Sequence, residues 1–169
     1  ITGINGGVGW LATDVGRQIF FNSGYATITA RTNSTVAVAT ITTAFTNTDA
    51  TAAFQLGSFS DTTGHPSCVT FFEQRLVFAG TTDQPQTIFF SKSGDYENMD
   101  ENIGGTVADD DAMVYTIASN QVNAIRFMTA TRTLIIGTAG GEFTVSGGGT
   151  DSAVTPTNIL IKKQSNHGS

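Results

Sequence analysis

The sequence predicts an all-β protein, with a small β-barrel or sandwich domain followed by part of a β-propeller built from antiparallel blades. Charged residues make up only 13% of the chain, against roughly 25% in an average soluble domain, which leaves little material for solvated amphipathic helices. Short runs of β-branched and aromatic residues alternate with turns rich in Gly, Asn and Asp. One such pattern occurs twice, as repeated propeller blades require.

The small β-domain is predicted at residues 1–53. It opens with a Gly-rich, irregular stretch at 1–17, and alternating residues then predict three strands at 18–21, 25–31 and 35–43. Together with the flanking Phe45 and Phe54, these strands would form the barrel or sandwich. Because its side chains are mostly Thr and Ala, we expect the stability of this sheet to depend on docking against neighbours.

The second domain is predicted at residues 54–169, after a polar boundary segment. Its centre is a hairpin within Cys68–Tyr96, because two apolar runs flank the Gly, Asp and Pro residues of 80–86. Further strands are expected at 54–60, at 112–118 and from Asn158, together with a second hairpin at 125–146. Two loops are expected between them, an acidic one from Gly94 and a flexible one at 147–152.

The second hairpin repeats the first. Arg75 matches Arg132, and the two stand 57 residues apart, close to the roughly 40–50 residues of a four-stranded blade. The other matched positions are Leu76–Phe78 with Leu134–Ile136, Gly80–Thr81 with Gly137–Thr138, and Ser91 with Ser146. An Arg that enters an apolar strand usually pairs with a carboxylate or with loop carbonyls, so we expect the same structural brace in both blades.

The charge balance argues against a surface that grips nucleic acid. The formal net charge is −6, whereas such surfaces are built mainly from Lys and Arg. An acidic balance does fit a channel through which DNA slides without sticking. The single Cys68 cannot form an intrachain disulfide and is interpreted as a small buried hydrophobe. No run approaches the roughly 18 apolar residues of a membrane helix, and the ends at Ile1 and Ser169 lead us to expect a piece of a longer protein.

No catalytic, cofactor-binding or metal-binding residue is predicted, and no cofactor. Asp109, Asp110 and Asp111 form the densest charge, and they are consistent with a solvated acidic loop, an Asx-type cap or, as the weaker alternative, a calcium site. His65 and His167 lack a neighbouring Cys or His at zinc spacing. The glycines from Gly3 to Gly9 imitate a dinucleotide fingerprint, but no strand precedes them, so a plain loop is expected.

The sequence lacks the features of two kinds of hydrolase. The serine-hydrolase elbow G-x-S-x-G is absent from the sequence, although Val145–Gly147 offers half of it. A propeller glycosidase needs two carboxylates across one site. Solvated loop positions are the default for the available acids, which are Glu73, Asp95, Glu97 and Glu142.

Three segments carry a family resemblance, and they are F-F-E-Q-R-L-V-F-A-G-T-T-D-Q-P-Q-T-I-F-F-S-K-S-G-D-Y-E-N-M, D-D-D-A-M-V-Y-T-I-A-S-N-Q-V-N-A-I and R-T-L-I-I-G-T-A-G-G-E-F-T-V-S-G. They resemble the tail tubular protein B, or tail nozzle, family of short-tailed bacteriophages. The earlier D-V-G-R-Q-I-F-F-N-S-G-Y-A-T-I-T-A is similar to the small β-domain that precedes that region in the family. The resemblance covers roughly Asp14 to Ser169. Nozzle proteins are several times longer, so the propeller here would be incomplete.

The resemblance implies a virion structural protein that is not an enzyme, assembled in the host cytoplasm into a phage tail. Its expected partners are further copies of itself in a ring, hexameric in the family, together with the adaptor and tail-fibre proteins. Viral DNA would pass through the ring without sequence-specific binding, and no small-molecule substrate is implied. The alternative is a carbohydrate- or receptor-binding β-module of a tail fibre or adhesin. Against it, Trp10 is the only Trp, and most Phe residues lie in strand patterns that we expect to be buried.

Overall fold

The structure, a computed structural model, confirms the all-β class. It describes residues 3–102, 105–118, 123–149 and 152–168. These residues form three four-stranded antiparallel sheets, and in this part of the chain the only helical segments are the short 3-10 turns Ile4–Gly7 and Ala12–Asp14. No helix among the described residues is long and apolar enough to cross a membrane.

The chain divides into two compact units. Unit 1 comprises Ile1–Gly64 with Asn102–Thr106, and unit 2 comprises His65–Glu101 with Val107–Ser169. The sequence places the boundary after residue 53, whereas the compact units divide after Gly64. The difference arises because the short strand expected to open the second domain pairs with a strand of the first.

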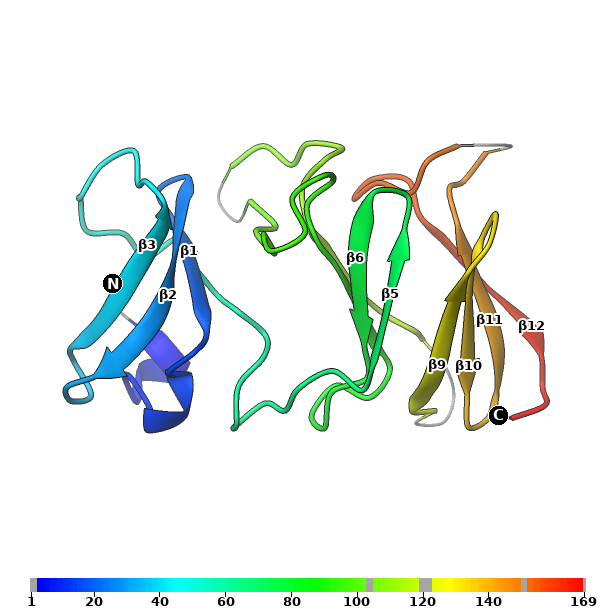
Figure 1. The fold of residues 1–169 in the computed structure, drawn as a ribbon, viewed down its shortest axis with the longest axis horizontal. Coiled ribbons are helices and arrows are strands. Elements are labelled where there is room, and N and C mark those ends of the chain that lie inside the picture. Colours follow the sequence, from blue (N-terminus) through cyan, green and yellow to red (C-terminus); the bar gives the residue numbers. More distant parts are fainter. Residues whose placement is uncertain (1–2, 103–104, 119–122, 150–151, 169) are drawn as a thin grey trace. The chain divides into compact units, whose positions relative to one another are not determined.

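Unit 1 contains one open sheet with the strand order β3-β2-β1-β4 (Figure 1). The strands are β1 (Gln18–Phe21), β2 (Gly24–Arg31), β3 (Ala37–Thr43) and β4 (Gln55–Leu56). A two-residue turn joins β1 to β2, and both of its residues, Asn22 and Ser23, have positive φ angles of 46° and 57°. This turn matches the right-handed twist of the strands that it connects. The sheet does not close on itself, because β3 and β4 are its edges among the described residues.

Both faces of this sheet carry buried side chains, since Phe20 and Tyr25 on one face are 2% and 5% exposed and a core cluster lies on the other face. The fully buried members of this cluster are Ile4, Ile19, Ala26 and Ile28, with Trp10, Phe21, Ala37, Phe45, Phe54 and Leu56 packed around them. The Phe21 and Phe45 rings stack at a centroid distance of 4.0 Å. Strand β3 adds little to this core, since six of its seven residues are exposed.

Unit 2 contains two sheets of identical construction. The first has the order β5-β6-β7-β8, with strands at Cys68–Phe72, Arg75–Ala79, Thr87–Phe90 and Met113–Thr116. The second has the order β12-β11-β10-β9, and its strands β9 to β12 lie at Ile125–Ala130, Leu134–Thr138, Gly141–Ser146 and Leu160–Ser165. Each sheet is a meander in which every strand pairs with its neighbour in sequence. The two predicted hairpins are therefore parts of two successive four-stranded sheets.

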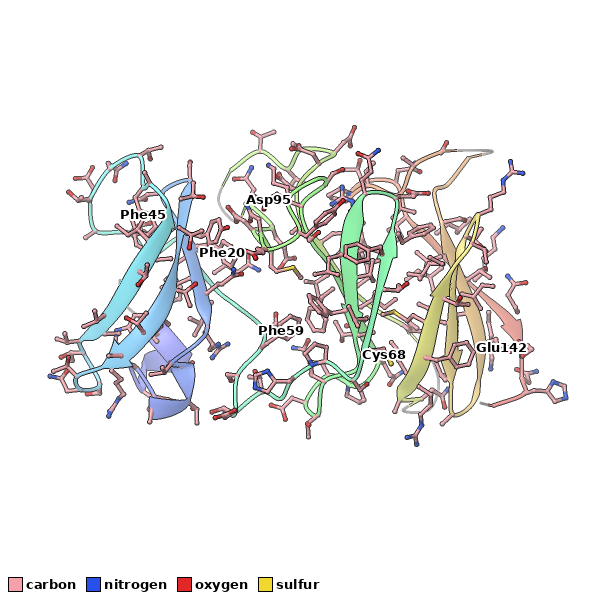
Figure 2. All side chains as sticks on the ribbon, viewed as in Figure 1. Phe20, Phe45, Phe59, Cys68, Asp95 and Glu142 are labelled. Atoms are coloured by element: carbon pink, nitrogen blue, oxygen red, sulfur yellow. The ribbon has the colours of Figure 1, made fainter. Side chains whose placement is uncertain are left out.

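The two sheets of unit 2 lie face to face over one shared core (Figure 1). Alternate residues of each strand supply this core, as the period of a strand requires. Its fully buried large members include Val77, Ile88 and Phe90 from the first sheet and Leu134, Ile136 and Val145 from the second. The first strands of the two sheets, β5 and β9, make the closest approach between them. Cys68 is half-buried at this core, on β5 (Figure 2).

The structure corrects the register of the sequence repeat. Arg75 is the first residue of β6, lies opposite Phe72 and is only 2% exposed. In the second sheet the corresponding position is Leu134, which lies opposite Ala130, while Arg132 is exposed in the turn before it. The cause is the turn length, because two residues separate β5 from β6 and three separate β9 from β10. The predicted brace is therefore present at Arg75, but a buried arginine is not repeated at Arg132.

Candidate functional site

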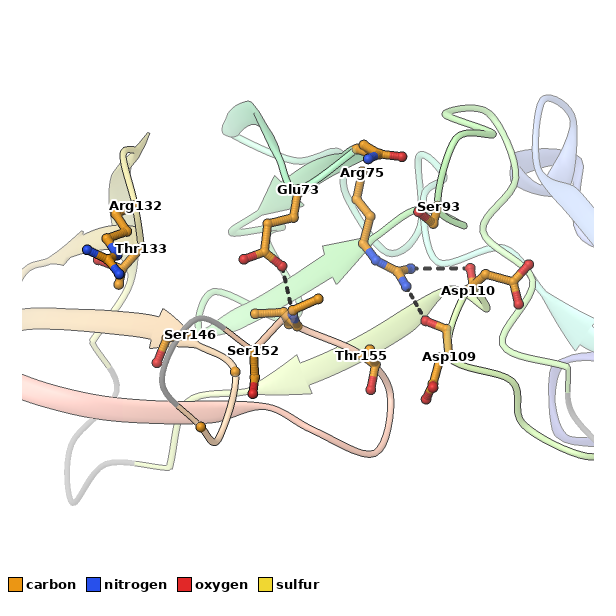
Figure 3. Close-up of a pocket in the computed structure, with 15 residues that line it drawn as sticks. Glu73, Arg75, Ser93, Asp109, Asp110, Arg132, Thr133, Ser146, Ser152 and Thr155 are labelled. Carbon is orange, nitrogen blue, oxygen red and sulfur yellow. Dashed lines mark hydrogen bonds between the residues drawn. The ribbon is translucent and has the colours of Figure 1, made fainter.

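A polar cleft of about 760 Å³ opens at one end of unit 2 and is lined by turns from both sheets (Figure 3). The first sheet contributes the β5–β6 turn and the acidic loop before β8. The second contributes the β9–β10 turn and the segment that links β11 to β12. The lining residues with polar side chains are Glu73, Gln74, Arg75, Ser93, Asp109, Asp110, Arg132, Thr133, Ser146, Ser152 and Thr155.

Arg75 organises one wall of the cleft. It follows the turn Glu73–Gln74, whose positive φ angles of 47° and 62° return the chain sharply into β6. The side chain donates through Nη1 to the carbonyl oxygens of Ser91 and Asp111, both at 2.7 Å, and through Nη2 to the carbonyl of Asp109 at 2.6 Å. A longer bond of 3.4 Å reaches the carbonyl of Asp110. The guanidinium thus fixes the backbone of the acidic loop.

Two carboxylates of the acidic loop, those of Asp110 and Asp111, share Lys92, and the third has a different partner. Asp111 is 4% exposed, and its Oδ2 accepts a hydrogen bond from the Ala108 N–H at 2.8 Å. The donor precedes Asp111 by three residues, whereas an Asx-type cap accepts from a residue further along the chain. Lys92 Nζ lies 3.1 Å from Asp111 Oδ1 and 3.1 Å from Asp110 Oδ2. Asp109 Oδ1 accepts a 3.4 Å hydrogen bond from Thr157 Oγ1. Among the described residues, no group of three or more His, Cys, Asp or Glu could hold a metal ion.

The charges of this wall shift one another's pKa values. Burial lowers the pKa of Arg75, and the nearby carboxylates, Asp110 first, oppose that shift; an arginine nevertheless stays charged. Burial also acts to lower the pKa of Lys92, but the hydrogen bonds with Asp110 and Asp111 outweigh it and raise that pKa. The hydrogen bond from Lys92 in turn lowers the pKa of Asp110. Both members of the Lys92–Asp110 pair are therefore ionised at neutral pH.

Glu73 joins the two sheets across the cleft. Its Oε2 accepts a hydrogen bond from the backbone N–H of Val154 at 2.6 Å (Figure 3). The donor belongs to the segment between β11 and β12, where Ser152, Ala153 and Val154 line the cleft. Of the flexible loop predicted at 147–152, Thr150 and Asp151 lie outside the described residues. A charged acceptor on a backbone donor makes a strong hydrogen bond, so this contact holds the loops of the two sheets together.

The cleft does not assemble the predicted carboxylates into one site. Only Glu73 of the four lines it. Asp95 and Glu97 belong to the loop after β7, and Glu142 on β11 accepts a hydrogen bond from Ser165 at 3.1 Å; Asp95 and Glu142 lie well apart in Figure 2. His65 and His167 are exposed, and neither is among the described residues that line the cleft.

Sequence reasoning missed the polar centre of unit 1. Asp14 is fully buried, and its Oδ1 lies 2.9 Å from Arg17 Nη1. Its Oδ2 accepts from the Leu11 N–H at 2.7 Å and from Asn5 Nδ2 at 2.8 Å. Arg17 also donates to the carbonyl of Gly57 at 2.7 Å. The spacing of an Asp and an Arg three residues apart, just before the first strand, was the available signal.

Both polar centres hold loops in place, and the described residues of the cleft show no nucleophile beside a histidine. Comparison with protein-family models finds no matching family, and comparison with curated proteins finds no matching relative.

Proposed function

We propose that this chain is a non-enzymatic structural component of a bacteriophage tail, in which unit 2 supplies two successive blades of a β-propeller. The observation that carries the proposal is the construction of unit 2. Its two sheets are consecutive four-stranded meanders with the same strand order, and their first strands β5 and β9 approach each other most closely. Blades in a propeller repeat in this way around an axis, with their first strands innermost.

Exposed apolar side chains on the outer faces of the two sheets support the same proposal. Val69 and Phe71 on the first sheet are each 60% exposed, and Phe127 on the second is 41% exposed. These residues point away from the shared core. In a propeller each blade face packs against the next blade, so further blades would cover them.

Within the phage tail, the protein would form a ring-shaped nozzle through which the genome leaves, with the hexameric form that the resemblance implies. Adaptor and tail-fibre proteins would be its neighbours. The net charge of −6 suits a channel wall that DNA passes without binding, because phosphates are not attracted to it. The cleft of unit 2 would then serve as a junction that keeps neighbouring blade loops rigid.

Electron microscopy of the purified protein tests this proposal. We expect ring-shaped particles with an axial channel, in which the β5 and β9 strands lie nearest to the channel of each propeller. Particles that stay monomeric, or elongated trimers without a channel, would contradict the nozzle.

One observation favours the alternative of a carbohydrate-binding module. Phe71 and Tyr96 form an exposed edge-to-face pair with ring centroids 5.2 Å apart, although most Phe residues were expected to be buried. Exposed aromatic rings can stack on sugars. A glycan array distinguishes the two functions, because binding that is lost in Tyr96→Ala supports the alternative, whereas the nozzle predicts no glycan binding.

A further inference from the structure

The outer edge of β3 is an unprotected sheet edge. Among the described residues, β2 is the only strand that pairs with β3. Alternate residues of an edge strand direct their N–H and C=O groups away from the sheet, so β3 presents a row of available donors and acceptors. Six of its seven residues are exposed, and Val38 and Ile41 are 51% and 58% exposed.

This edge lacks the features that usually prevent two sheets from joining. Residues 32–46 contain no charged residue and no Pro, although Lys and Pro are the common protective residues of edge strands. The β12 edge of unit 2 provides the contrast, since it carries the exposed residues Lys162 and Lys163. Two chains of net charge −6 repel each other, and the neutral stretch at 32–46 is a surface where they can meet without placing like charges opposite each other.

An apolar groove of about 280 Å³ runs beside the same edge. It is lined by Trp10, Ile19, Phe21, Ala26, Ile28, Ala37, Ala39, Ile41 and Phe45. Trp10 lies at the start of β3, because its N–H donates to the Ser34 carbonyl at 2.8 Å. A strand added to β3 would place alternate side chains over this face and cover the exposed part of Ile41.

The residues of β3 are complementary to themselves. The pairing of β2 with β3 has two register shifts, and the one that places an extra residue in β3 comes after Ile41. Residues 37–41, with the sequence A-V-A-T-I, therefore form a regular strand. Antiparallel pairing of two copies about Ala39 sets Ala37 of each copy against Ile41 of the other, on the groove face. It sets Val38 against Thr40 on the opposite face. On the groove face the small Ala37 thus opposes the large Ile41, and on the other face the β-branched Val38 and Thr40 oppose each other. Both are favourable cross-strand pairs.

We propose that β3 pairs in antiparallel register with β3 of a second copy of this chain, centred on Ala39, and joins two unit 1 sheets into one. The contact is two-fold and therefore links two copies without closing a ring. It goes beyond the proposed tail function and does not depend on it. A single strand pair buries less surface than a standard interface, so the dimer is expected to be weak and concentration-dependent.

Sedimentation equilibrium of the chain and of three charge variants tests the contact. The double variant Val38→Lys/Thr40→Lys places like charges opposite each other twice and is expected to weaken the dimer about tenfold or more. The variant Val38→Lys/Thr40→Glu has opposite charges at the same pair of positions and is expected to dimerise within about threefold of the wild type. Thr129→Lys, at an exposed position of unit 2, controls for added charge and should change nothing. Far-UV circular dichroism confirms that each variant is folded.

Cysteine crosslinking tests the register, in a Cys68→Ser background. Ala39→Cys is expected to crosslink rapidly with a short bismaleimide, because residue 39 faces itself across the two-fold axis. Ala37→Cys, on the same face of the same strand, is the matched control. Its two copies would stand four residues apart along the strands, about 13 Å, and should crosslink poorly.

Three results would overturn the inference. They are a chain that remains monomeric up to about 1 mM, a Val38→Lys/Thr40→Lys variant that associates like the wild type, and Ala37→Cys crosslinking as fast as Ala39→Cys. Rings that form while the Lys/Lys variant dimerises as strongly as the wild type would contradict this contact and leave the proposed nozzle intact. A β3-dependent dimer without rings would support the contact and contradict the nozzle.

Discussion

Units 1 and 2 contain sheets of the same size that reach stability in different ways. In unit 2 two sheets cover each other, and their core consists of large side chains with no exposed surface, such as Phe90 and Leu134. Unit 1 has a single sheet, and its edge strand β3 is exposed at six of seven residues. A large part of β3 is therefore left outside the core, whereas both hairpins of unit 2 contribute fully buried side chains to theirs.

The largest expected effect comes from the shared core of unit 2. Phe90→Ala removes a ring with no exposed surface and should lower the free energy of unfolding by about 3–5 kcal/mol, through lost burial and the cavity left behind. Ile41→Ala in β3, where the side chain is 58% exposed, should cost less than about 1 kcal/mol. Urea unfolding followed by circular dichroism measures both. Equal losses at the two positions would show that the contrast between the units is mistaken.

Asp14→Ala should have the next largest effect, because it leaves the buried Arg17 without its carboxylate. Removing one member of a buried ion pair costs about 3 kcal/mol or more. Trp10 is the only Trp and lies in unit 1, so its fluorescence reports the unfolding of that unit. Asp49→Ala, at an exposed loop position, is the control and should change the stability by no more than about 0.5 kcal/mol. If Asp14→Ala and Asp49→Ala unfold at similar midpoints in the Trp10 fluorescence, the Asp14 contacts do not stabilise unit 1.

Arg75→Lys and Arg132→Lys form a matched pair within unit 2. A lysine cannot hold the carbonyls of Ser91, Asp111 and Asp109 together, as Arg75 does, so the first change should cost about 2 kcal/mol. The second replaces an exposed side chain and should cost less than about 0.5 kcal/mol. Thermal unfolding compares them. Equal losses of stability in the two variants would imply that the buried Arg75 contributes no more to folding than the exposed Arg132.

The smallest effect concerns pH. The pKa of Asp110 is lowered in the folded protein by the hydrogen bond from Lys92, so its contribution is present at neutral pH and is lost as the pH falls below the ordinary value of 3.8. The pair is partly solvated, with 55% of the Asp110 side chain exposed, so the effect should be small and weaker in salt. Asp110→Asn should therefore lower the urea midpoint slightly at pH 7 and by less at pH 3. A difference that is the same at both pH values would rule out the ion pair as its cause.

Local patterns of the sequence predicted most strands correctly, because alternation and turn residues act over a few positions. The prediction of a brace at Arg75 was also correct, since a charged residue inside an apolar run requires partners. The repeat at Arg132 was wrong, because one additional turn residue changes which side chains face the core. Short β4 was assigned to the wrong side of the boundary, since two residues carry no periodicity and only pairing with β1 reveals their place.

Contacts between distant loops were beyond sequence reasoning. The carboxylate of Glu73 was visible as a candidate acid, but its acceptance of the Val154 N–H depends on the two sheets being folded already. Asp14 is a different case, because its partners Leu11, Asn5 and Arg17 are close in sequence. They form no periodic pattern, and the spacing between Asp14 and Arg17 was the only local signal.

The Glu73–Val154 hydrogen bond also has a consequence for folding kinetics. It spans 81 residues, whereas the strand pairs of each meander join neighbours in sequence. Long-range contacts carry a greater loop-closure entropy and form after local ones. We therefore expect this bond to form late, after both meanders, and a late contact affects the unfolding rate more than the folding rate. The hydrogen bond of Glu73 is therefore expected to slow the unfolding of unit 2.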